Sequence, residues 1–145
     1  MRKHIVLAIA ALVTPILAAI AVAGGGSDEE RAVREVVDLY FQGHATGNGE
    51  PWRVAFHPES KLFWVKDGQL AQRTSAAFIA GATGQPAPDE AKRKRRILSV
   101  DVSNDAAVAK VDLDYPGRHL VDYLSLLKVD GRWKIVNKIF TTMPQ

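Results

Sequence analysis

Apolar and polar residues alternate on both sides of the pair Asp130-Gly131 in the last third of the chain, from His119 to Met143. An Asp-Gly pair supplies the positive φ angles of a two-residue turn, so the pattern predicts a β-hairpin. Counting back from the turn places two sets of residue pairs on opposite faces. The first face carries Val129 opposite Arg132, Leu127 opposite Lys134, and Tyr123 opposite Lys138. The second face carries Trp133, Leu126 opposite Ile135, Leu124 opposite Asn137, and Asp122 opposite Ile139.

The second face is apolar except at its centre, where Asp122 and Asn137 are expected to lie diagonally close. A carboxylate and an amide on a core-facing sheet surface are costly unless they are hydrogen-bonded, so this placement predicts a lined cavity. The first face mixes apolar and polar side chains, among them Val121, Tyr123 and Phe140. Such a face suits a homodimer interface or a solvated exterior.

Two further hairpins are predicted upstream. Asp67-Gly68 is expected to form a turn that sets Val65 opposite Leu70. Asn104-Asp105 is expected to join strands 97–103 and 106–115. Its register places an apolar set on one face: Leu98, Val100, Val102, Ala107, Ala109, Val111 and Leu113. The other face receives Ser99 opposite Lys110 and Arg95 opposite Asp114, which leaves Arg96 on the core side near Leu113.

Helical patterns precede the strands. Ser27 and Glu30 fit a capping box, in which Glu30 reaches back to the Ser27 amide. The helix that follows buries a stripe and ends at Gly43 and Gly47; the stripe contains Val33, Val36, Val37, Tyr40, Phe41 and His44. A second short helix is expected from Pro51, and a third after a cap at Thr74 or Ser75. Helices grouped before strands predict an α+β fold, a cone-shaped curved antiparallel sheet packed on three N-terminal helices.

The first 23 residues have the pattern of an export signal. Arg2, Lys3 and His4 form a basic head, an apolar run follows, and Ala21-Val22-Ala23 gives a small-x-small cleavage pattern. Residues 1–23 are therefore expected to be a signal peptide, 24–27 a linker and 28–145 one domain. We expect a periplasmic or secreted protein with no stable membrane insertion after cleavage; the alternative is a retained N-terminal anchor. The chain has no cysteine, which excludes a lipoprotein, disulfides and thiolate metal sites.

Charge favours no nucleic-acid partner. The chain has 19 basic and 16 acidic residues, and loss of Arg2 and Lys3 would leave 17 against 16. Five consecutive basic residues, 92–96, alternate between the two faces of a predicted strand. Arg96 is expected on the core side, where it could bind an anionic ligand or neutralise Asp122; a solvated strand start is the alternative.

Asp122 is the first candidate for chemistry. A carboxylate on an apolar face is expected to have a raised pKa, which suits a general base that removes a proton beside a carbonyl. His57, at the turn into the first strand, is its candidate acid/base partner. Asn137 is expected to bind a ligand oxygen or to satisfy Asp122. The alternative for Asp122 is a structural carboxylate that accepts hydrogen bonds from backbone amides or pairs with an arginine.

Aromatic residues supply candidate pocket walls. Tyr40 and Trp52 are expected to contact a flat ligand, with Tyr40 needing a partner for its hydroxyl; core packing is the alternative. The histidines have no metal-ligand spacing, so no metal site is predicted. The segment GNGEPW lacks the spacing of a dinucleotide loop, and no Gly-x-Ser-x-Gly motif occurs. No cofactor is predicted.

Three stretches carry a resemblance to a known superfamily: AVREVVDLYFQGHATGNGEPWRVAFHPESKLFWVKDGQL, RRILSVDVSNDAAVAKVDL and VDYLSLLKVDGRWKIVNKIF. Their order is similar to that of the nuclear transport factor 2-like superfamily, and most similar to its small exported members called putative lumazine-binding proteins. The resemblance implies a conical α+β fold with an internal pocket, often dimerised through the outer sheet face. Relatives include ketosteroid isomerase, scytalone dehydratase, polyketide cyclases and pure binding domains, so the fold does not choose the function.

Three functions follow as hypotheses. The favoured one is an exported domain that binds a small apolar or aromatic ligand, oriented by Asp122 and Asn137 with help from His57 or Arg96. The second is a cofactor-free lyase or isomerase in which Asp122 removes a proton and His57 or Tyr40 stabilises the oxyanion. The third is a homodimeric protein-interaction module that uses the outer sheet face.

Overall fold

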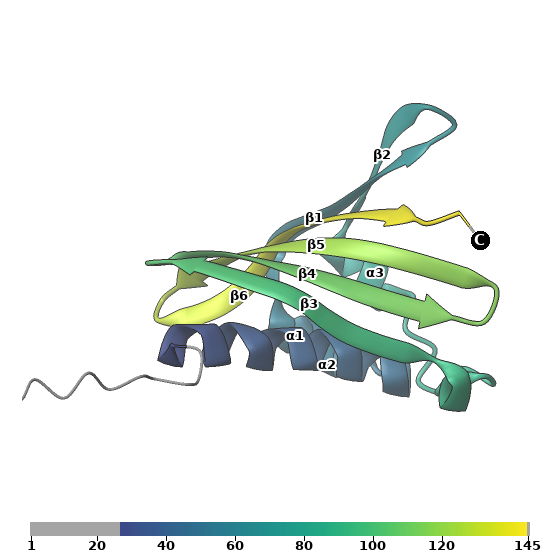
Figure 1. The fold of residues 1–145 in the computed structure, drawn as a ribbon, viewed down its shortest axis with the longest axis horizontal. Helices are drawn as coiled ribbons and strands as arrows, with labels where there is room; N and C mark the ends of the chain where they lie inside the picture. Colours follow the sequence, from purple (N-terminus) through teal and green to yellow (C-terminus); the bar gives the residue numbers. More distant parts are fainter. Residues whose placement is uncertain (1–26, 145) are drawn as a thin grey trace, which may run out of the picture.

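One six-stranded sheet organises the molecule, and helices cover one of its faces (Figure 1). The computed structural model describes residues 27–144, so the predicted signal peptide and residues 24–26 of the linker lie outside the described residues. The elements run in the order α1 (Asp28–Thr46), α2 (Gly49–Ala55), β1 (Phe56–Lys66), β2 (Gln69–Thr74), α3 (Ser75–Ala80), a 3₁₀ turn η1 (Glu90–Lys92), β3 (Lys94–Ser103), β4 (Ala106–Tyr115), β5 (Arg118–Val129) and β6 (Arg132–Thr142). The predicted α+β class is confirmed. None of the helices within residues 27–144 is long and apolar enough to cross a membrane.

The strand order is β2-β1-β6-β5-β4-β3. Neighbouring strands are antiparallel except for β1 and β6, which pair in parallel. The β1–β2 hairpin rises away from the rest of the sheet, whereas α1 and α2 lie beneath it (Figure 1). The buried stripe of α1 packs on the concave sheet face; the core includes Val33, Val37, Tyr40, Ala109, Val111, Leu124, Leu126 and Ile135.

Most local signals at the helix ends act as predicted, but Gly43 lies inside α1, and α2 begins at Gly49, two residues before Pro51. Ser27 Oγ accepts a hydrogen bond from the Glu30 amide, and Gly47 ends α1 with a φ of 66°. The Glu30 carboxylate, however, binds Arg34 one turn along the helix instead of returning to Ser27. Asn48 caps α2 and Thr74 caps α3. These short helices are placed by capping side chains that the sequence shows directly.

All three predicted hairpin turns are present. The first residue of each turn has positive φ: 52° at Asp67, 55° at Asn104 and 49° at Asp130. Val65 pairs with Leu70 as predicted. Aspartate and asparagine tolerate this conformation better than most residues, which explains the turn positions.

A β-bulge in β6 changes the predicted register of the last hairpin. The pairs nearest the turn are as predicted, down to Leu126 with Ile135. Val136 is then the extra residue, because the next pair is Ser125 with Asn137. Beyond it the pairs are Leu124 with Lys138, Tyr123 with Ile139 and Asp122 with Phe140. The predicted pairing of Leu124 with Asn137 and of Asp122 with Ile139 is therefore wrong. A slip of one residue exchanges the faces, so Lys138 and Phe140 share the concave face with Asp122.

A second bulge, at Leu98 in β3, exchanges the two arginines. Ile97 pairs with Val111 and Ser99 with Lys110, which leaves Leu98 unpaired and half exposed. Arg95 then pairs with Leu113 and Arg96 with Asp112. The predicted pairing of Arg95 with Asp114 is wrong, and so is the core-side position of Arg96.

Candidate functional site

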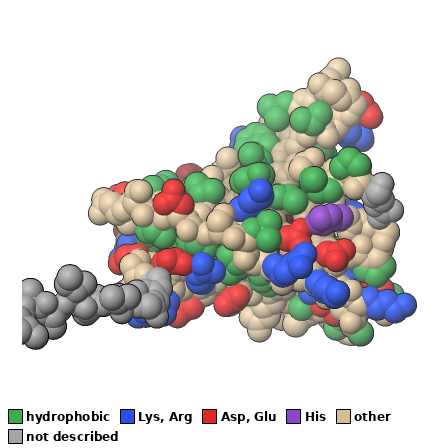
Figure 2. Space-filling view, in the orientation of Figure 1, with side chains coloured by type: hydrophobic (Ala, Val, Ile, Leu, Met, Phe, Trp, Pro, Cys, Tyr) green, Lys and Arg blue, Asp and Glu red, His purple; other side chains and the backbone are tan. Residues whose placement is uncertain are grey.

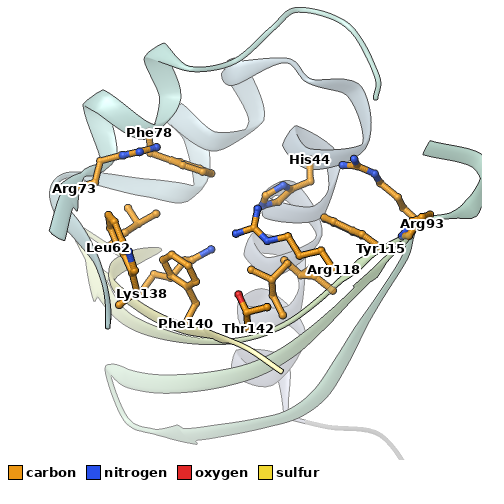
Figure 3. A pocket seen from close by; sticks show the side chains of 14 residues that line it. His44, Leu62, Arg73, Phe78, Arg93, Tyr115, Arg118, Lys138, Phe140 and Thr142 are labelled. Carbon is orange, nitrogen blue, oxygen red and sulfur yellow. The ribbon is translucent and has the colours of Figure 1, made fainter. Parts of the chain in front are cut away.

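A cavity of about 730 Å³ opens at one end of the concave sheet face. Its wall includes His44, Arg73, Phe78, Tyr115, Arg118 and Lys138. In Figure 3, the side chains of Lys138 and Arg118 extend into the same space, with Phe140 and Thr142 beside them. The volume lies within the roughly 300–1,000 Å³ typical of small-molecule pockets.

Three polar side chains meet beneath this cavity. The Tyr40 hydroxyl donates a hydrogen bond of 2.6 Å to Asp122 Oδ2. The Lys138 ammonium donates to the same Oδ2 at 2.8 Å and to the Tyr40 hydroxyl oxygen at 2.6 Å. Asp122 and Tyr40 are fully buried, and Lys138 is 4% exposed. Lys138 is the member that lines the cavity, so it stands between Asp122 and any ligand there.

Burial sets the protonation of this cluster. Removal from water lowers the pKa of Lys138, while the adjacent Asp122 carboxylate acts in the opposite direction. Burial and the Asp122 charge together raise the pKa of Tyr40 well above its ordinary value, so this phenol remains a donor at neutral pH. The Lys138 nitrogen also lies 4.7 Å from the ring centre of Phe140 and 5.8 Å from that of Phe78. These rings keep the ammonium in an apolar, partly cation–π environment.

His44 contributes a neutral imidazole to the cavity wall. Its ring packs edge-on against Tyr40 and Trp52, with centroid distances of 4.7 and 5.0 Å. Burial, followed by the charges of Lys138 and Arg95, lowers the pKa of His44 well below its ordinary value. Its Nε2 is buried and has no hydrogen-bond partner within residues 27–144. The cavity wall therefore contains, beside the charged cluster, a ring nitrogen that makes no hydrogen bond within residues 27–144.

The rim of the cavity is basic. Arg73, Arg93 and Arg118 line it together with Lys138, and no carboxylate of the described chain does so. Arg93 is held by Asp89 at 2.8 Å and stacks on the ring of Tyr115 at 4.5 Å. Arg73 and Arg118 have no ion-pair partner in the described part of the chain. Two guanidinium groups are thus free to meet an anion.

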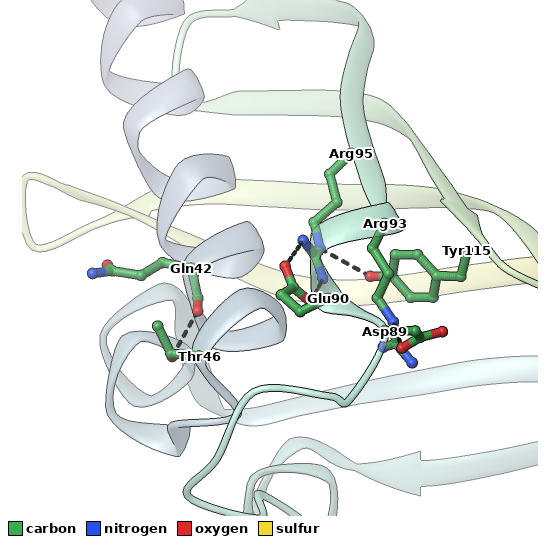
Figure 4. A network of polar contacts seen from close by, with 7 residues as sticks. All are labelled: Gln42, Thr46, Asp89, Glu90, Arg93, Arg95 and Tyr115. Atoms are coloured by element: carbon green, nitrogen blue, oxygen red, sulfur yellow. Dashed lines mark hydrogen bonds and ion pairs between the residues drawn. The ribbon is translucent and has the colours of Figure 1, made fainter.

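A polar network fixes one wall of this rim (Figure 4). Arg95 binds the Glu90 carboxylate through two bonds of 2.6 and 2.8 Å and donates to the Tyr115 hydroxyl at 3.0 Å. Burial disfavours the charged guanidinium, but the Glu90 and Tyr115 contacts outweigh it and raise the pKa of Arg95. The network holds Tyr115 in position against the cavity, because its ring contacts the guanidinium groups of both Arg93 and Arg95, at 4.5 and 5.0 Å from its centre.

The structure brings some of the predicted site residues together and separates others. Tyr40 and Asp122 are joined directly. Trp52 is buried behind them and donates its indole N–H to the Tyr40 carbonyl at 2.9 Å. His57 lines a separate hollow with Arg53 and Ser75, and its Nδ1 accepts a hydrogen bond from the Glu59 amide.

Asn137 and Arg96 also lie apart from the cluster. Asn137 pairs with Ser125 beyond the bulge, and its buried Oδ1 has no partner in residues 27–144. The predicted contact between Asn137 and Asp122 is replaced by the contact of Lys138. Arg96 binds Asp112 at 2.6 Å and its side chain is 61% exposed. A cation therefore neutralises Asp122 as expected, but this cation is Lys138 and not Arg96.

Sequence reasoning missed Lys138, His44 and Arg118 as site residues. Lys138 was assigned to the outer face because strict alternation has no place for Val136 as an extra residue. The adjacent polar pair Asn137-Lys138 was the only available hint, since either residue could face inward after one slip. The helix stripe predicts His44 as a buried residue without giving it a role, and no pattern in the sequence marks Arg118.

Comparisons with known proteins agree with this fold. Residues 28–141 match the sequence model of the family described as "Putative lumazine-binding". The chain is 23% identical over 119 residues to the aldolase FrzH of a Cladobotryum species, covering 82% of this chain and 95% of that relative. A nuclear transport factor 2-like protein of unknown function from Shewanella baltica has a similar structure, with a TM-score of 0.72, 29% identity, and 81% and 95% of the two chains covered.

A second such protein of unknown function, from Silicibacter pomeroyi, has a TM-score of 0.70 and 25% identity, with 81% and 98% of the two chains covered. A cystatin-like fold protein from Burkholderia xenovorans, at 16% identity and a TM-score of 0.64 over 82% and 95% of the chains, shares the fold alone. The family match extends over most of the chain, from the start of α1 to the next-to-last residue of β6. This chain belongs to the putative lumazine-binding family of the nuclear transport factor 2-like superfamily.

Proposed function

We propose that this chain binds a small organic anion with a flat apolar body in the cavity above Lys138. The observation that carries the proposal is the charge of the wall: three arginines and one lysine line it, and no carboxylate from residues 27–144 does. Two of these arginines, Arg73 and Arg118, have no ion-pair partner within residues 27–144. An anionic group on the ligand would satisfy them.

The ligand contacts follow from the chemistry of the wall. A guanidinium binds a carboxylate through two parallel hydrogen bonds, so Arg118 or Arg73 would hold the acidic group. Phe78, Tyr115 and Phe140 offer ring faces and edges to the apolar body. The sequence predicted an apolar or aromatic ligand, with Arg96 as the residue that could bind an anionic group. We assign that contact to Arg118 and Arg73 instead, because Arg96 binds Asp112.

A second candidate function is cofactor-free chemistry on a carbonyl compound. Its support is the Lys138–Tyr40–Asp122 cluster, in which a buried amine, a phenol and a carboxylate are in direct contact. This cluster takes the place of the predicted Asp122–His57 pair, since His57 lines another hollow. The aldolase relative, a protein named for carbonyl chemistry, adds weight to this candidate.

Export and dimerisation stay predictions. The proposed periplasmic or secreted location depends on residues 1–23, which the structure does not describe. The proposed homodimer would use the outer sheet face, where Val108, Tyr123 and Ile139 are exposed. In Figure 2, apolar side chains are interspersed with charged and histidine side chains on the face drawn. Such a mixture is common at interfaces between non-obligate partners.

Calorimetric titration of the full chain with 2-naphthoate and with its neutral analogue 2-naphthalenemethanol tests the anion proposal. We expect the acid to bind about tenfold more tightly, because a charge-assisted hydrogen bond contributes roughly 1.5 kcal/mol or more. Arg118→Met should reduce binding of the acid and leave that of the alcohol unchanged. Arg132→Met, at an exposed arginine outside this cavity, is the matched control. Equal affinities for the acid and the alcohol would refute the proposal.

A further inference from the structure

We propose that Lys138 is a nucleophile that forms an imine with the carbonyl group of a ligand in this cavity. The inference rests on the proposed function, since the same cavity must first admit the ligand. It adds a covalent step and narrows the ligand to an aldehyde or ketone that also carries an anionic group.

The position of Lys138 is the first argument. Its side chain is 6% exposed, and it is the one member of the buried polar cluster that lines the cavity. The rings of Tyr40, Phe78 and Phe140 lie 5.1, 5.8 and 4.7 Å from its nitrogen. An amine in such apolar surroundings suits Schiff-base formation, which requires the neutral form. Burial lowers the pKa of Lys138 and so increases that form.

A proton acceptor for Lys138 is already in contact. Asp122 Oδ2 lies 2.8 Å from the amine nitrogen. The second oxygen of this carboxylate, Oδ1, is buried and has no hydrogen-bond partner in the described chain. The Tyr40 hydroxyl touches both groups, at 2.6 Å from each. A proton can therefore pass between the amine and the carboxylate without solvent.

The step balances within these residues. The Lys138 ammonium gives one proton to Asp122, and the amine electron pair attacks the carbonyl carbon while the C=O π pair moves to oxygen. Asp122 returns its proton to this oxygen, and the nitrogen passes a second proton to the same oxygen through the Tyr40 hydroxyl, which gives one proton and takes one. The oxygen then leaves as water, and the lone pair freed on the nitrogen forms the C=N bond. The net reaction joins one carbonyl compound and one lysine ammonium to give one iminium and one water. No oxidant, reductant or cofactor is consumed.

The cavity wall defines what else the ligand carries. Arg118 and Arg73 would hold its anionic group, and Tyr115 would contact a flat body between that group and the carbonyl. An aromatic aldehyde with a carboxylate meets these requirements. We therefore choose 4-carboxybenzaldehyde as the probe and benzaldehyde as the probe without the anion.

The experiment treats the full chain with 4-carboxybenzaldehyde and sodium borohydride, which reduces an imine to a stable secondary amine, and maps the adduct by peptide mass spectrometry. We expect labelling of Lys138 to exceed that of the exposed Lys92, because burial lowers the pKa of Lys138 and Asp122 is in place to accept its proton. Labelling confined to exposed lysines would overturn the proposal. This readout uses the unmodified chain and needs no variant to fold.

Variants then test the cluster. Lys138→Arg keeps the positive charge beside Asp122 and should abolish the adduct at this position. Tyr40→Phe should slow adduct formation at Lys138 without changing the affinity for 2-naphthoate. An unchanged rate in Tyr40→Phe would refute the proton path through the phenol.

The covalent step and the anion site can fail separately. If 2-naphthoate binds but borohydride fixes no adduct on Lys138, imine formation is wrong and the proposed function stands. If Lys138 is labelled equally by both aldehydes and 2-naphthoate shows no preference over its alcohol, the imine stands and the anion site is wrong. Loss of preference for 4-carboxybenzaldehyde in Arg118→Met would support both.

Discussion

Two aspartates on neighbouring strands, Asp112 in β4 and Asp122 in β5, sit in nearly the same part of the sheet but face opposite sides. Val111 pairs with Asp122, and Asp112 pairs with Val121, so the two carboxylates are offset by one position in the ladder. Both side chains are nearly inaccessible, with exposures of 5% for Asp112 and 0% for Asp122. Burial of the carboxylate alone does not distinguish them.

The side chains that bind these two carboxylates differ in their contact with water. Asp112 is bound on the outer face by Arg96 and by His119, whose side chains are 61% and 39% exposed. Burial alone would raise the pKa of Asp112, but hydrogen bonds from these two residues outweigh it and hold the pKa below its ordinary value. On the inner face, burial lowers the pKa of Lys138. In the pair of Asp122 with Lys138 both charged groups are buried, whereas in the pair of Asp112 with Arg96 only the carboxylate is. Burial of both charged groups is the condition that shifts the pKa of a catalytic or nucleophilic side chain.

The largest expected effect of this difference is on stability. Lys138→Met would leave the Asp122 carboxylate buried beside Tyr40 without a countercharge, and we expect a loss of about 3–5 kcal/mol in the free energy of unfolding. Urea denaturation of the full chain measures it. The double variant Asp122→Asn with Lys138→Met should recover much of the loss, because the charge itself is removed. If the single and double variants lost the same free energy of unfolding, the unpaired charge of Asp122 would not be the cause of the loss.

Most of the fold could be predicted from the sequence, because the turn and cap residues that it shows act in the structure as expected. The hairpin turns at Asp67, Asn104 and Asp130 were predicted from residue types that tolerate positive φ. The caps of the helices were also visible, at Ser27 and Thr74. Each of these features depends on neighbours within four residues, which a single sequence displays.

The site was only partly predictable, because its geometry depends on bulges. Tyr40 and Asp122 were found as candidate residues, but their partner Lys138 was assigned to the outer face. Val136 and Leu98 each shift a strand by one residue. The first shift turns Lys138 toward the core in place of Asn137, and the second turns Arg95 inward in place of Arg96. A bulge is decided by pairing across strands, and here β6 is also constrained by its parallel neighbour β1. Alternation along one strand cannot reveal it.

The second prediction concerns acid sensitivity on the inner side. The unfolded chain should protonate His44 near its ordinary value of 6.5, whereas burial keeps the folded pKa well below this value. The unfolded state then binds more protons below pH 6.5, so stability is fully present above that pH and falls as pH decreases toward the folded pKa. His44→Phe keeps an aromatic ring against Tyr40 and Trp52 but cannot titrate. Thermal denaturation across this range should give a flatter pH dependence in the variant; an unchanged slope would contradict the assignment to His44.

The smallest expected effect is on the outer side. Asp112→Asn removes the charge that binds Arg96 and His119, yet both of these side chains remain in contact with water, so we expect roughly a quarter of the loss seen in Lys138→Met. Salt sharpens the contrast, because about 1 M sodium chloride screens exposed charges over a few ångströms. Urea denaturation with and without this salt should show that the effect of Asp112→Asn shrinks, whereas the effect of Lys138→Met persists. If salt diminished both effects equally, the inner pair would be as open to solvent as the outer one, and the enclosed amine on which imine formation depends would not exist.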